Sequence, residues 1–342
     1  MNVHRSGLSW QVLCLLSMNL LTAQTSGVQD TLIDTRVVYA KVIEQNQSLV
    51  IDTVVTMDFY FRFMDSLVAQ LRRWGWSDLN EHMLVRFNPW LLEVLANTDY
   101  YILTEKGLNG DDPLTLTVLQ PGDVMRIPDT HQIDSLHSTF NQTWLDLNVP
   151  EFAIRIMVGQ EPYLAFSVRV GRNEKKFLAM AGREVDLRTK IGQGRIVSIN
   201  RYPDFINPVD NVKYTTTRRD DNRVTRLPRI PFLEPEINGI RYGQMIHPTT
   251  NPVTLGKAYS NGCIGVSESA AWYVYYYAPV GTKIRIRYDL EVINPQGDTI
   301  VLPDIYHPAT NTDRTYSAPA DGTTFDHWCF PNQVPLHQNS KS

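Results

Sequence analysis

Apolar residues recur with a helical spacing early in the chain and with a spacing of two in its second half. Between residues 57 and 97 they lie three and four positions apart, which predicts helices with one buried face. Asn88 followed by Pro89 has the form of an N-cap with proline at the first helical position. Residues 24–56 hold only short β-branched runs, so we expect them to be extended or weakly ordered.

From Trp144 onward apolar and polar positions alternate, which is typical of half-buried strands. Alternating runs on either side of the turn at 159–162 predict a β-hairpin over 152–170. We also expect strands at 196–199, 241–247 and 282–288 and a short helix at 269–277. Residues 98–143 are expected to form a connector, and the last forty residues a loose extension. Residues 203–235 are rich in Pro, Asp, Asn and Arg without a period, which favours a functional loop such as a lid or a substrate-facing wall.

Composition narrows the classes of protein that the chain can belong to. Its 342 residues are 43% hydrophobic and carry a net charge of only -4, which excludes a disordered chain. Lys and Arg do not gather into a basic stripe, so nucleic acid is not an expected partner. No apolar run of membrane-spanning length follows the first thirty residues.

The first residues have the pattern of an export signal. Arg5 precedes a mostly apolar run over 8–23, and cleavage is expected near Ala23–Gln24. The predicted location is therefore the periplasm or cell envelope, with no transmembrane anchor after cleavage. Cys263 and Cys329 would remain, either as a disulfide or as one reactive thiol and one bystander.

The most distinctive chemistry surrounds Cys263. Glycines on both sides permit a tight turn that could expose the sulfur, although a free cysteine is more often a small buried hydrophobe. His247 ends a predicted strand sixteen residues upstream and could serve as the base that a cysteine nucleophile needs. It could also be an ordinary surface histidine. No Cys and His set has the spacing of zinc ligands, so we expect neither metal nor cofactor.

A family resemblance covers about residues 144–291. Its elements occur in a matching order and spacing: Ile246-His247, Gly256-Lys257, Ser260-x-Gly262-Cys263-Ile264 and Ala278-Pro279-Val280-Gly281-Thr282. This segment resembles the L,D-transpeptidase catalytic domain, the YkuD domain. The opening strands after Asn148, the Val-x-Val-Gly run at 168–171 and the stretch at 186–194 are similar to that domain too.

The resemblance implies an α+β fold. A mostly β YkuD-like catalytic domain, a twisted mixed-sheet sandwich or open barrel, would follow a separate helical N-terminal region. The expected boundaries are a signal peptide at 1–23, the N-terminal region at 24–143, the catalytic domain at 144–303 and a C-terminal extension at 304–342. Within the N-terminal region, residues 119–128 resemble the closing turn and strand of a LysM module, or are simply a proline–glycine turn before a strand.

The resemblance also implies roles for individual residues. Cys263 would be the nucleophile, His247 its base, and the Pro248 carbonyl would orient the imidazole. Backbone N–H groups of Gly262 and Cys263 would stabilise the oxyanion, with Asn261 as a further donor. The family usually has His where this chain has Asn261, and often has Gly where it has Pro248.

Gly265 is a further departure, because the family usually has Arg two residues after the cysteine. Substrate anchoring must then come from elsewhere. The candidates for substrate binding are Ser260, Tyr259, Lys257 and Arg241, with Arg218, Arg219 and Arg223 of the long loop.

The implied reaction is acyl transfer on peptidoglycan. Cys263 would form a thioester with a stem tetrapeptide, and an amine of another stem or of a protein would take the acyl group. Carbapenems would be expected inhibitors. If water were the acceptor, the enzyme would be an L,D-carboxypeptidase. A non-catalytic peptidoglycan-binding scaffold, with the helical region as its working part, is the alternative from another class. A disulfide between Cys263 and Cys329 would silence the enzyme.

Overall fold

The computed structural model describes residues 40–43, 47–108, 110, 112–294 and 297–307. The expected signal peptide, Cys329 and nearly all of the expected C-terminal extension lie outside these residues, as do their predicted structures.

The N-terminal part of the described chain mixes short strands with five helices. Its elements are β1 (Ala40–Ile43), β2 (Ser48–Ile51), β3 (Val55–Thr56), α1 (Tyr60–Arg73), α2 (Glu81–Phe87), α3 (Pro89–Ala96), α4 (Tyr100–Glu105), β4 (Thr117–Leu119), β5 (Val124–Arg126) and α5 (Thr130–Gln142). The helices predicted within 57–97 are confirmed, with Pro89 opening α3. The Asn88 side chain bonds Leu84 O and the Arg126 backbone, which joins α2 to β5.

The expected connector at 98–143 is more ordered than predicted. It contains α4 and α5, which the apolar pattern did not indicate because α5 buries a single residue, Ile133. Asp129 and Gln132 form a capping box at the start of α5 instead. The turn at 121–122 leads into β5, which pairs with β2 in an antiparallel register.

The second part is dominated by strands. They are β6 (Thr143–Asn148), β7 (Ala153–Val158), β8 (Glu161–Ser167), β9 (Val170–Gly171), β10 (Lys175–Leu178), β11 (Arg183–Asp186), β12 (Gly192–Asn200), β13 (Phe205–Ile206), β14 (Lys213–Tyr214), β15 (Thr216–Arg218), β16 (Val224–Arg226), β17 (Phe232–Ile237), β18 (Ile246–Pro248), β19 (Ala258–Ser260), β20 (Ile264–Val266), β21 (Lys283–Arg287), β22 (Glu291–Ile293) and β23 (Thr299–Val301). The helix α6 (Glu268–Tyr277) follows β20.

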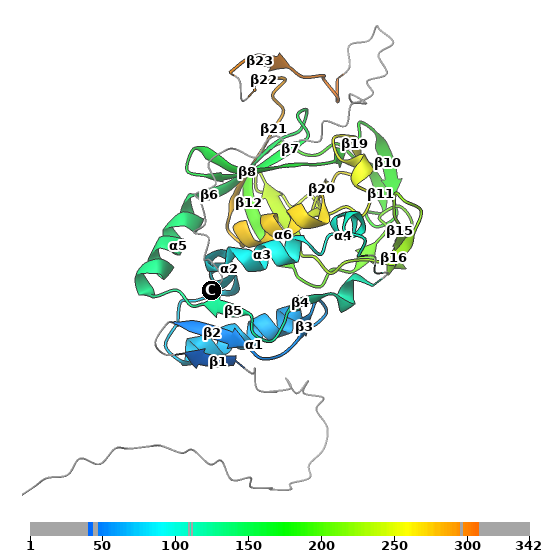
Figure 1. The fold of residues 1–342 in the computed structure, drawn as a ribbon. Helices are drawn as coiled ribbons and strands as arrows, with labels where there is room; N and C mark the ends of the chain where they lie inside the picture. Colours follow the sequence, from blue (N-terminus) through cyan, green and yellow to red (C-terminus); the bar gives the residue numbers. More distant parts are fainter. Residues whose placement is uncertain (1–39, 44–46, 109, 111, 295–296, 308–342) are drawn as a thin grey trace, which may run out of the picture. The chain divides into compact units, whose positions relative to one another are not determined.

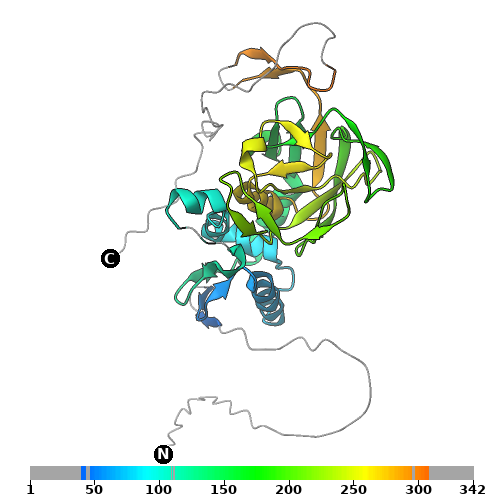
Figure 2. The ribbon, with the colours of Figure 1, turned by 90° about the vertical axis from the view of Figure 1, so that its right-hand side faces the viewer.

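Eight strands form one mixed sheet in the order β20-β18-β17-β12-β21-β6-β7-β8. Its two end strands approach one another, because the chain leaving β8 makes an antiparallel bridge from Arg169 to Gly265 in β20. The sheet is therefore nearly closed, and the expected mostly β domain preceded by helices is confirmed (Figures 1 and 2).

Most of the other predicted elements in this part are confirmed. The hairpin is β7–β8, and β12, β21 and α6 lie where the pattern predicted them. The strand expected at 241–247 is wrong for its first five residues, since Gly243 turns the chain with φ +72° and only 246–248 are extended. The expected loop at 203–235 is instead two short hairpins followed by β17, with Asn211 and Asn222 at positive φ in the turns.

α6 lies between the N-terminal helices and the mixed sheet (Figures 1 and 2). The Glu81 carboxylate of α2 accepts a hydrogen bond from Tyr276 at 2.6 Å and pairs with Arg201 at 2.8 Å. Asp99 accepts a bond from the Ser269 N–H at 2.9 Å, at the start of α6. Apolar side chains of both parts form one continuous core, so the N-terminal helices brace the helix that follows the Cys263 turn.

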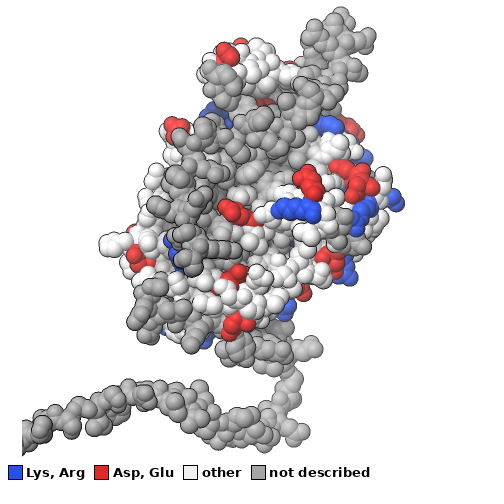
Figure 3. All heavy atoms as spheres, viewed as in Figure 1, with Lys and Arg blue, Asp and Glu red and all other residues white. Residues whose placement is uncertain are grey.

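None of the described helices is both long and apolar enough to cross a bilayer. On the face shown in Figure 3, acidic and basic groups are interspersed and neither sign dominates.

Candidate active site

His247 lies on β18, and Cys263 directly precedes the neighbouring parallel strand β20. In the register of β18 with β20, His247 is opposite Gly265. Because side chains two residues apart share a face, Cys263 and the position of Gly265 point to the same side as His247. The register therefore places His247 on β18 and Cys263 just before β20, at the same edge of the mixed sheet.

The imidazole of His247 is fixed in orientation and neutral. Its Nδ1 lies 2.8 Å from the Pro248 carbonyl oxygen, and its ring packs on Phe232 with centroids 4.9 Å apart. Burial, aided by the positive charge of Arg169, lowers the pKa of His247 to about 4. With Nδ1–H donating to the carbonyl, Nε2 is left as the acceptor and can take a proton.

Cys263 is half-buried and forms no disulfide with any of the described residues. Burial raises the pKa of its thiol above the ordinary value, while a backbone hydrogen bond with Met245 and the charge of Arg169 act in the opposite direction. The resting pair is therefore a neutral thiol beside a neutral imidazole, and a proton must move when the sulfur attacks.

Ser260 builds the turn that carries the cysteine. Its hydroxyl donates to the Cys263 carbonyl at 2.6 Å and accepts from the Gly262 N–H at 3.2 Å, while Gly262 adopts φ +111°. Ser260 is buried, which suits a structural role in the turn better than substrate contact. No hydrogen bond from the Cys263 N–H was found among the described residues.

An arginine that the sequence reasoning missed holds Asn261. The Arg172 guanidinium donates to Asn261 Oδ1 at 3.0 Å and lies 5.8 Å from the centre of the Tyr259 ring. The backbone N–H of Arg172 donates to Ser260 O at 3.1 Å. The only signal in the sequence was its place directly after the Val-x-Val-Gly run. Tyr259 itself is 56% exposed at the edge of this turn.

Two further residues that the sequence reasoning missed support the turn from behind. Thr189 donates to Gly262 O at 3.2 Å and accepts from the Gly171 N–H at 2.8 Å. The buried hydroxyl of Tyr306 donates to Gly171 O at 2.7 Å and accepts from the Thr189 N–H at 3.0 Å. Gly171 permits this approach, because a Cβ there would lie 1.9 Å from Leu187 O. Tyr306 belongs to the expected extension, and no local motif marks it.

The other candidates for substrate binding are engaged elsewhere or exposed. Arg241 pairs with Glu234, and Lys257 is exposed on the surface. Arg219 is fully buried in an ion pair with Glu268, which anchors the β15–β16 hairpin to α6. Arg218 and Arg223 belong to the same hairpin. Within the described ranges no group of three or more His, Cys, Asp or Glu side chains is arranged to hold a metal ion.

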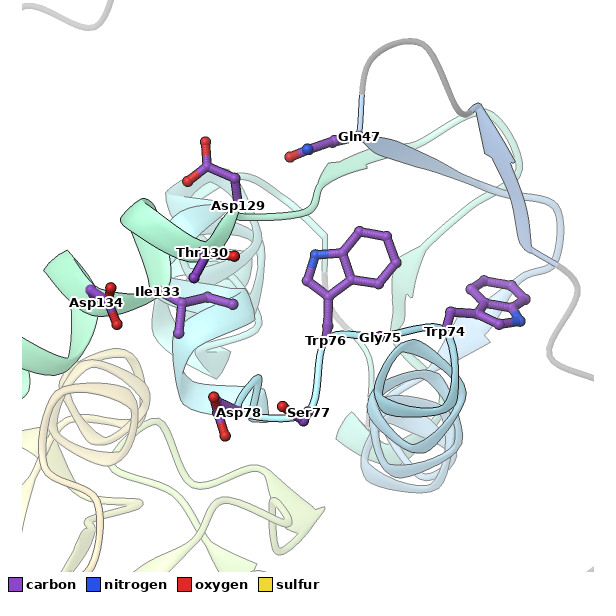
Figure 4. Close-up of a pocket in the computed structure, with 10 residues that line it drawn as sticks. All are labelled: Gln47, Trp74, Gly75, Trp76, Ser77, Asp78, Asp129, Thr130, Ile133 and Asp134. Carbon is purple, nitrogen blue, oxygen red and sulfur yellow. The ribbon is translucent and has the colours of Figure 1, made fainter.

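A separate hollow of about 370 Å³ lies in the N-terminal part (Figure 4). Trp74 and Trp76 stand on one side of it, at the end of α1 and in the turn that follows. The Trp76 indole N–H donates to Pro128 O at 3.0 Å, and Trp74 is 47% exposed. Polar side chains complete the lining: Gln47, Ser77, Asp78, Asp129, Thr130 and Asp134.

The fold and the Cys–His arrangement define a β-rich domain with a thiol at the seam of a nearly closed sheet. Residues 142–286 match the family model of the L,D-transpeptidase catalytic domain, YkuD, and the chain therefore carries a domain of that family. A comparison with curated proteins found no matching relative.

Solved L,D-transpeptidases resemble the chain at low identity. The structure of LdtMt1 in complex with imipenem is 14% identical, with 43% of this chain and 59% of that one covered at a TM-score of 0.30. L,D-transpeptidase 3 from Mycobacterium tuberculosis, in complex with a faropenem-derived adduct, is 14% identical over 43% and 60% of the two chains, with a TM-score of 0.29. The enzyme from Xylanimonas cellulosilytica is 14% identical over 58% and 91%, with a TM-score of 0.32. This chain thus covers less than two thirds of the first two structures.

Proposed function

We propose that the protein is a peptidoglycan L,D-transpeptidase that uses Cys263 as its nucleophile. The observation that supports the proposal is the parallel register of β18 with β20 within a YkuD domain, in which His247 is opposite Gly265, two residues after Cys263. A neutral histidine with a free Nε2 is suited to accept the thiol proton at the moment of attack.

The reaction would proceed in two acyl transfers. The Cys263 sulfur attacks the carbonyl of the L,D bond in a stem tetrapeptide while His247 takes the thiol proton. The tetrahedral intermediate collapses, the C–N bond breaks, and the imidazolium gives the proton to the departing D-residue amine. An amine of a second stem peptide or of a protein then attacks the thioester, loses its proton to His247, and releases the thiol.

The oxyanion of each intermediate needs hydrogen-bond donors. The Cys263 N–H is the best candidate because no described group engages it. The Gly262 N–H is already bonded to the Ser260 hydroxyl and would have to exchange that partner. The amide oxygen of Asn261 accepts a hydrogen bond from Arg172, so the NH₂ group of Asn261 remains available as a donor.

The expected export signal and the substrate class agree with each other. Stem peptides occur in the cell wall, so we propose that the mature protein acts in the periplasm or cell envelope. Carbapenems, which carry an acylating carbonyl, are the inhibitors that this proposal expects.

Product analysis tests the proposal and separates its variants. The mature protein would be incubated with a purified disaccharide tetrapeptide, beside a Cys263→Ala control, and the products identified by mass. A cross-linked dimer that has lost the terminal D-residue supports transpeptidation. A tripeptide alone would identify an L,D-carboxypeptidase. An unchanged substrate with folded, reduced protein would contradict both activities.

We propose a second function for the Trp74 hollow, which is contact with a glycan strand. Exposed indole faces stack on pyranose rings, and the carboxylates around them can accept hydrogen bonds from sugar hydroxyls. The N-terminal region would then bind the cell wall, as the scaffold alternative expects, in addition to the acyl transfer proposed for Cys263.

Sedimentation with purified cell-wall sacculi tests this second function. Trp74→Ala should lower the bound fraction, whereas Phe177→Ala, which removes a similarly exposed ring far away in sequence, should not. Equal binding of wild type and Trp74→Ala would refute it.

A further inference from the structure

Arg169 lies at the point where the sheet nearly closes. Its backbone N–H donates to Gly265 O at 2.8 Å, and its backbone carbonyl accepts from the Gly265 N–H at 3.0 Å. Gly265 is opposite His247 in the parallel register and two residues after Cys263. The backbone of Arg169 therefore lies on the edge of β20 opposite to β18, across Gly265 from His247.

The side chain of Arg169 occupies the space that a side chain at 265 would fill. A Cβ on Gly265 would lie 2.5 Å from Arg169 Nε, 2.7 Å from its Cγ and 3.0 Å from its Cδ. By strand alternation, that Cβ would point to the same side as the Cys263 side chain. The middle of the arginine side chain is thus packed across Gly265, on the face that carries the thiol.

The Arg169 guanidinium is partly buried, yet it has few hydrogen-bond partners. Its Nη1 donates to Thr254 Oγ1 at 3.3 Å, whereas Nε is buried without a hydrogen-bond partner. No carboxylate lies within ion-pair distance of it among the described residues. Burial lowers its pKa, and the groups that act on it in the opposite direction are Cys263, Tyr214, Tyr259 and Asp220, in that order.

Burial of an arginine with so few hydrogen-bond partners and no carboxylate partner costs free energy of folding. The attack step creates negative charge on the sulfur and then on the substrate oxygen, while the imidazole begins the step uncharged. A cation on the same face stabilises that charge as it forms.

We propose that the positive charge of Arg169 stabilises the Cys263 thiolate. Arg169 lies between β8 and β9, and the absence of a side chain on Gly265 gives it room. The inference rests on the proposed acyl-transfer function but needs no peptidoglycan substrate for its test. Gly265 and Arg169 then form one unit: the glycine is required because the arginine crosses it.

The test measures the rate at which iodoacetamide alkylates Cys263 as a function of pH, read by mass on the peptide that contains it. Arg169→Met keeps much of the apolar stem and removes the charge. We expect alkylation at pH 7 to fall about tenfold, with the midpoint of the pH profile moved up by about one unit. Arg169→Lys should restore most of the rate. Arg285→Gln removes an exposed arginine of β21 and should match the wild type.

Gly265→Ala provides a second, independent variant. Its methyl group would displace the Arg169 side chain, so it should slow alkylation to a similar extent in the wild type and add little in the Arg169→Met background. If Arg169→Met fails to fold by circular dichroism, Gly265→Ala alone carries the test. An unchanged pH midpoint in the folded variants would overturn the proposal. Because alkylation is independent of transpeptidation, that result would leave the proposed function standing.

Discussion

The hydroxyl of Tyr306 should contribute strongly to stability although it lies near the end of the described chain. Tyr306→Phe keeps the ring and removes the bonds to Gly171 O and to the Thr189 N–H, at 2.7 and 3.0 Å. Both backbone groups would be left buried without a partner, at about 1–3 kcal/mol each. We therefore expect the free energy of unfolding to fall by about 2–6 kcal/mol.

Equilibrium urea denaturation followed by tryptophan fluorescence measures this change, with Tyr242→Phe as the control. Tyr242 is 45% exposed, so removal of its hydroxyl should alter stability by less than about 0.5 kcal/mol. Cys263 should also be alkylated more slowly in Tyr306→Phe than in the wild type, because Thr189 connects Tyr306 to the Gly262 carbonyl. A Tyr306→Phe protein as stable as the control would refute the reasoning that these bonds hold the turn.

Three further predictions follow from the described contacts. Glu268→Gln should destabilise the fold by about 3–5 kcal/mol in urea, because it leaves the Arg219 charge buried without its partner, and Glu268→Leu with Arg219→Met should recover most of the loss. Ser260→Ala should slow alkylation of Cys263 by at least about tenfold, since two bonds of the turn are lost; a wild-type rate would show that the turn holds without them. His82 and His247 both have folded-state pKa values of about 4, below the ordinary 6.5, so the unfolded chain binds more protons between these values. Each histidine therefore contributes a loss of stability as the pH falls from 6.5 to about 4, whereas Glu268, whose pKa burial raises to about 7, acts in the opposite direction. Relative to the wild type, the urea midpoint of His82→Gln should fall less as the pH drops through this range, and the same pH dependence in both proteins would contradict the prediction.

The sequence predicted the elements whose burial follows a simple period. The face of α1, the β7–β8 hairpin and α6 each bury a regular set of apolar side chains, so their pattern is visible without a structure. α5 was missed because one buried residue gives no period, and its start is set by the Asp129 capping box. The two hairpins in 203–235 were missed because short, exposed strands alternate too little to be recognised.

The candidate site was predictable only where its residues are close in sequence. Cys263, Ser260 and Gly262 belong to one turn, and His247 lies on the adjoining strand. The residues that surround them come from distant segments, such as Arg172, Thr189 and Tyr306, and no local pattern marks these. The sequence pointed to Arg241, Lys257 and the long loop for the missing cation, whereas sheet closure brings Arg169 to Gly265.

Acylation of Cys263 is the claim on which the proposed function depends. Intact mass spectrometry of the reduced, mature protein after incubation with a carbapenem, beside Cys263→Ala, tests it most directly. We predict one covalent adduct on the wild type and none on the variant. Folded, reduced wild type that remains unmodified, or equal labelling of both proteins, would contradict an acyl-accepting thiol at this site.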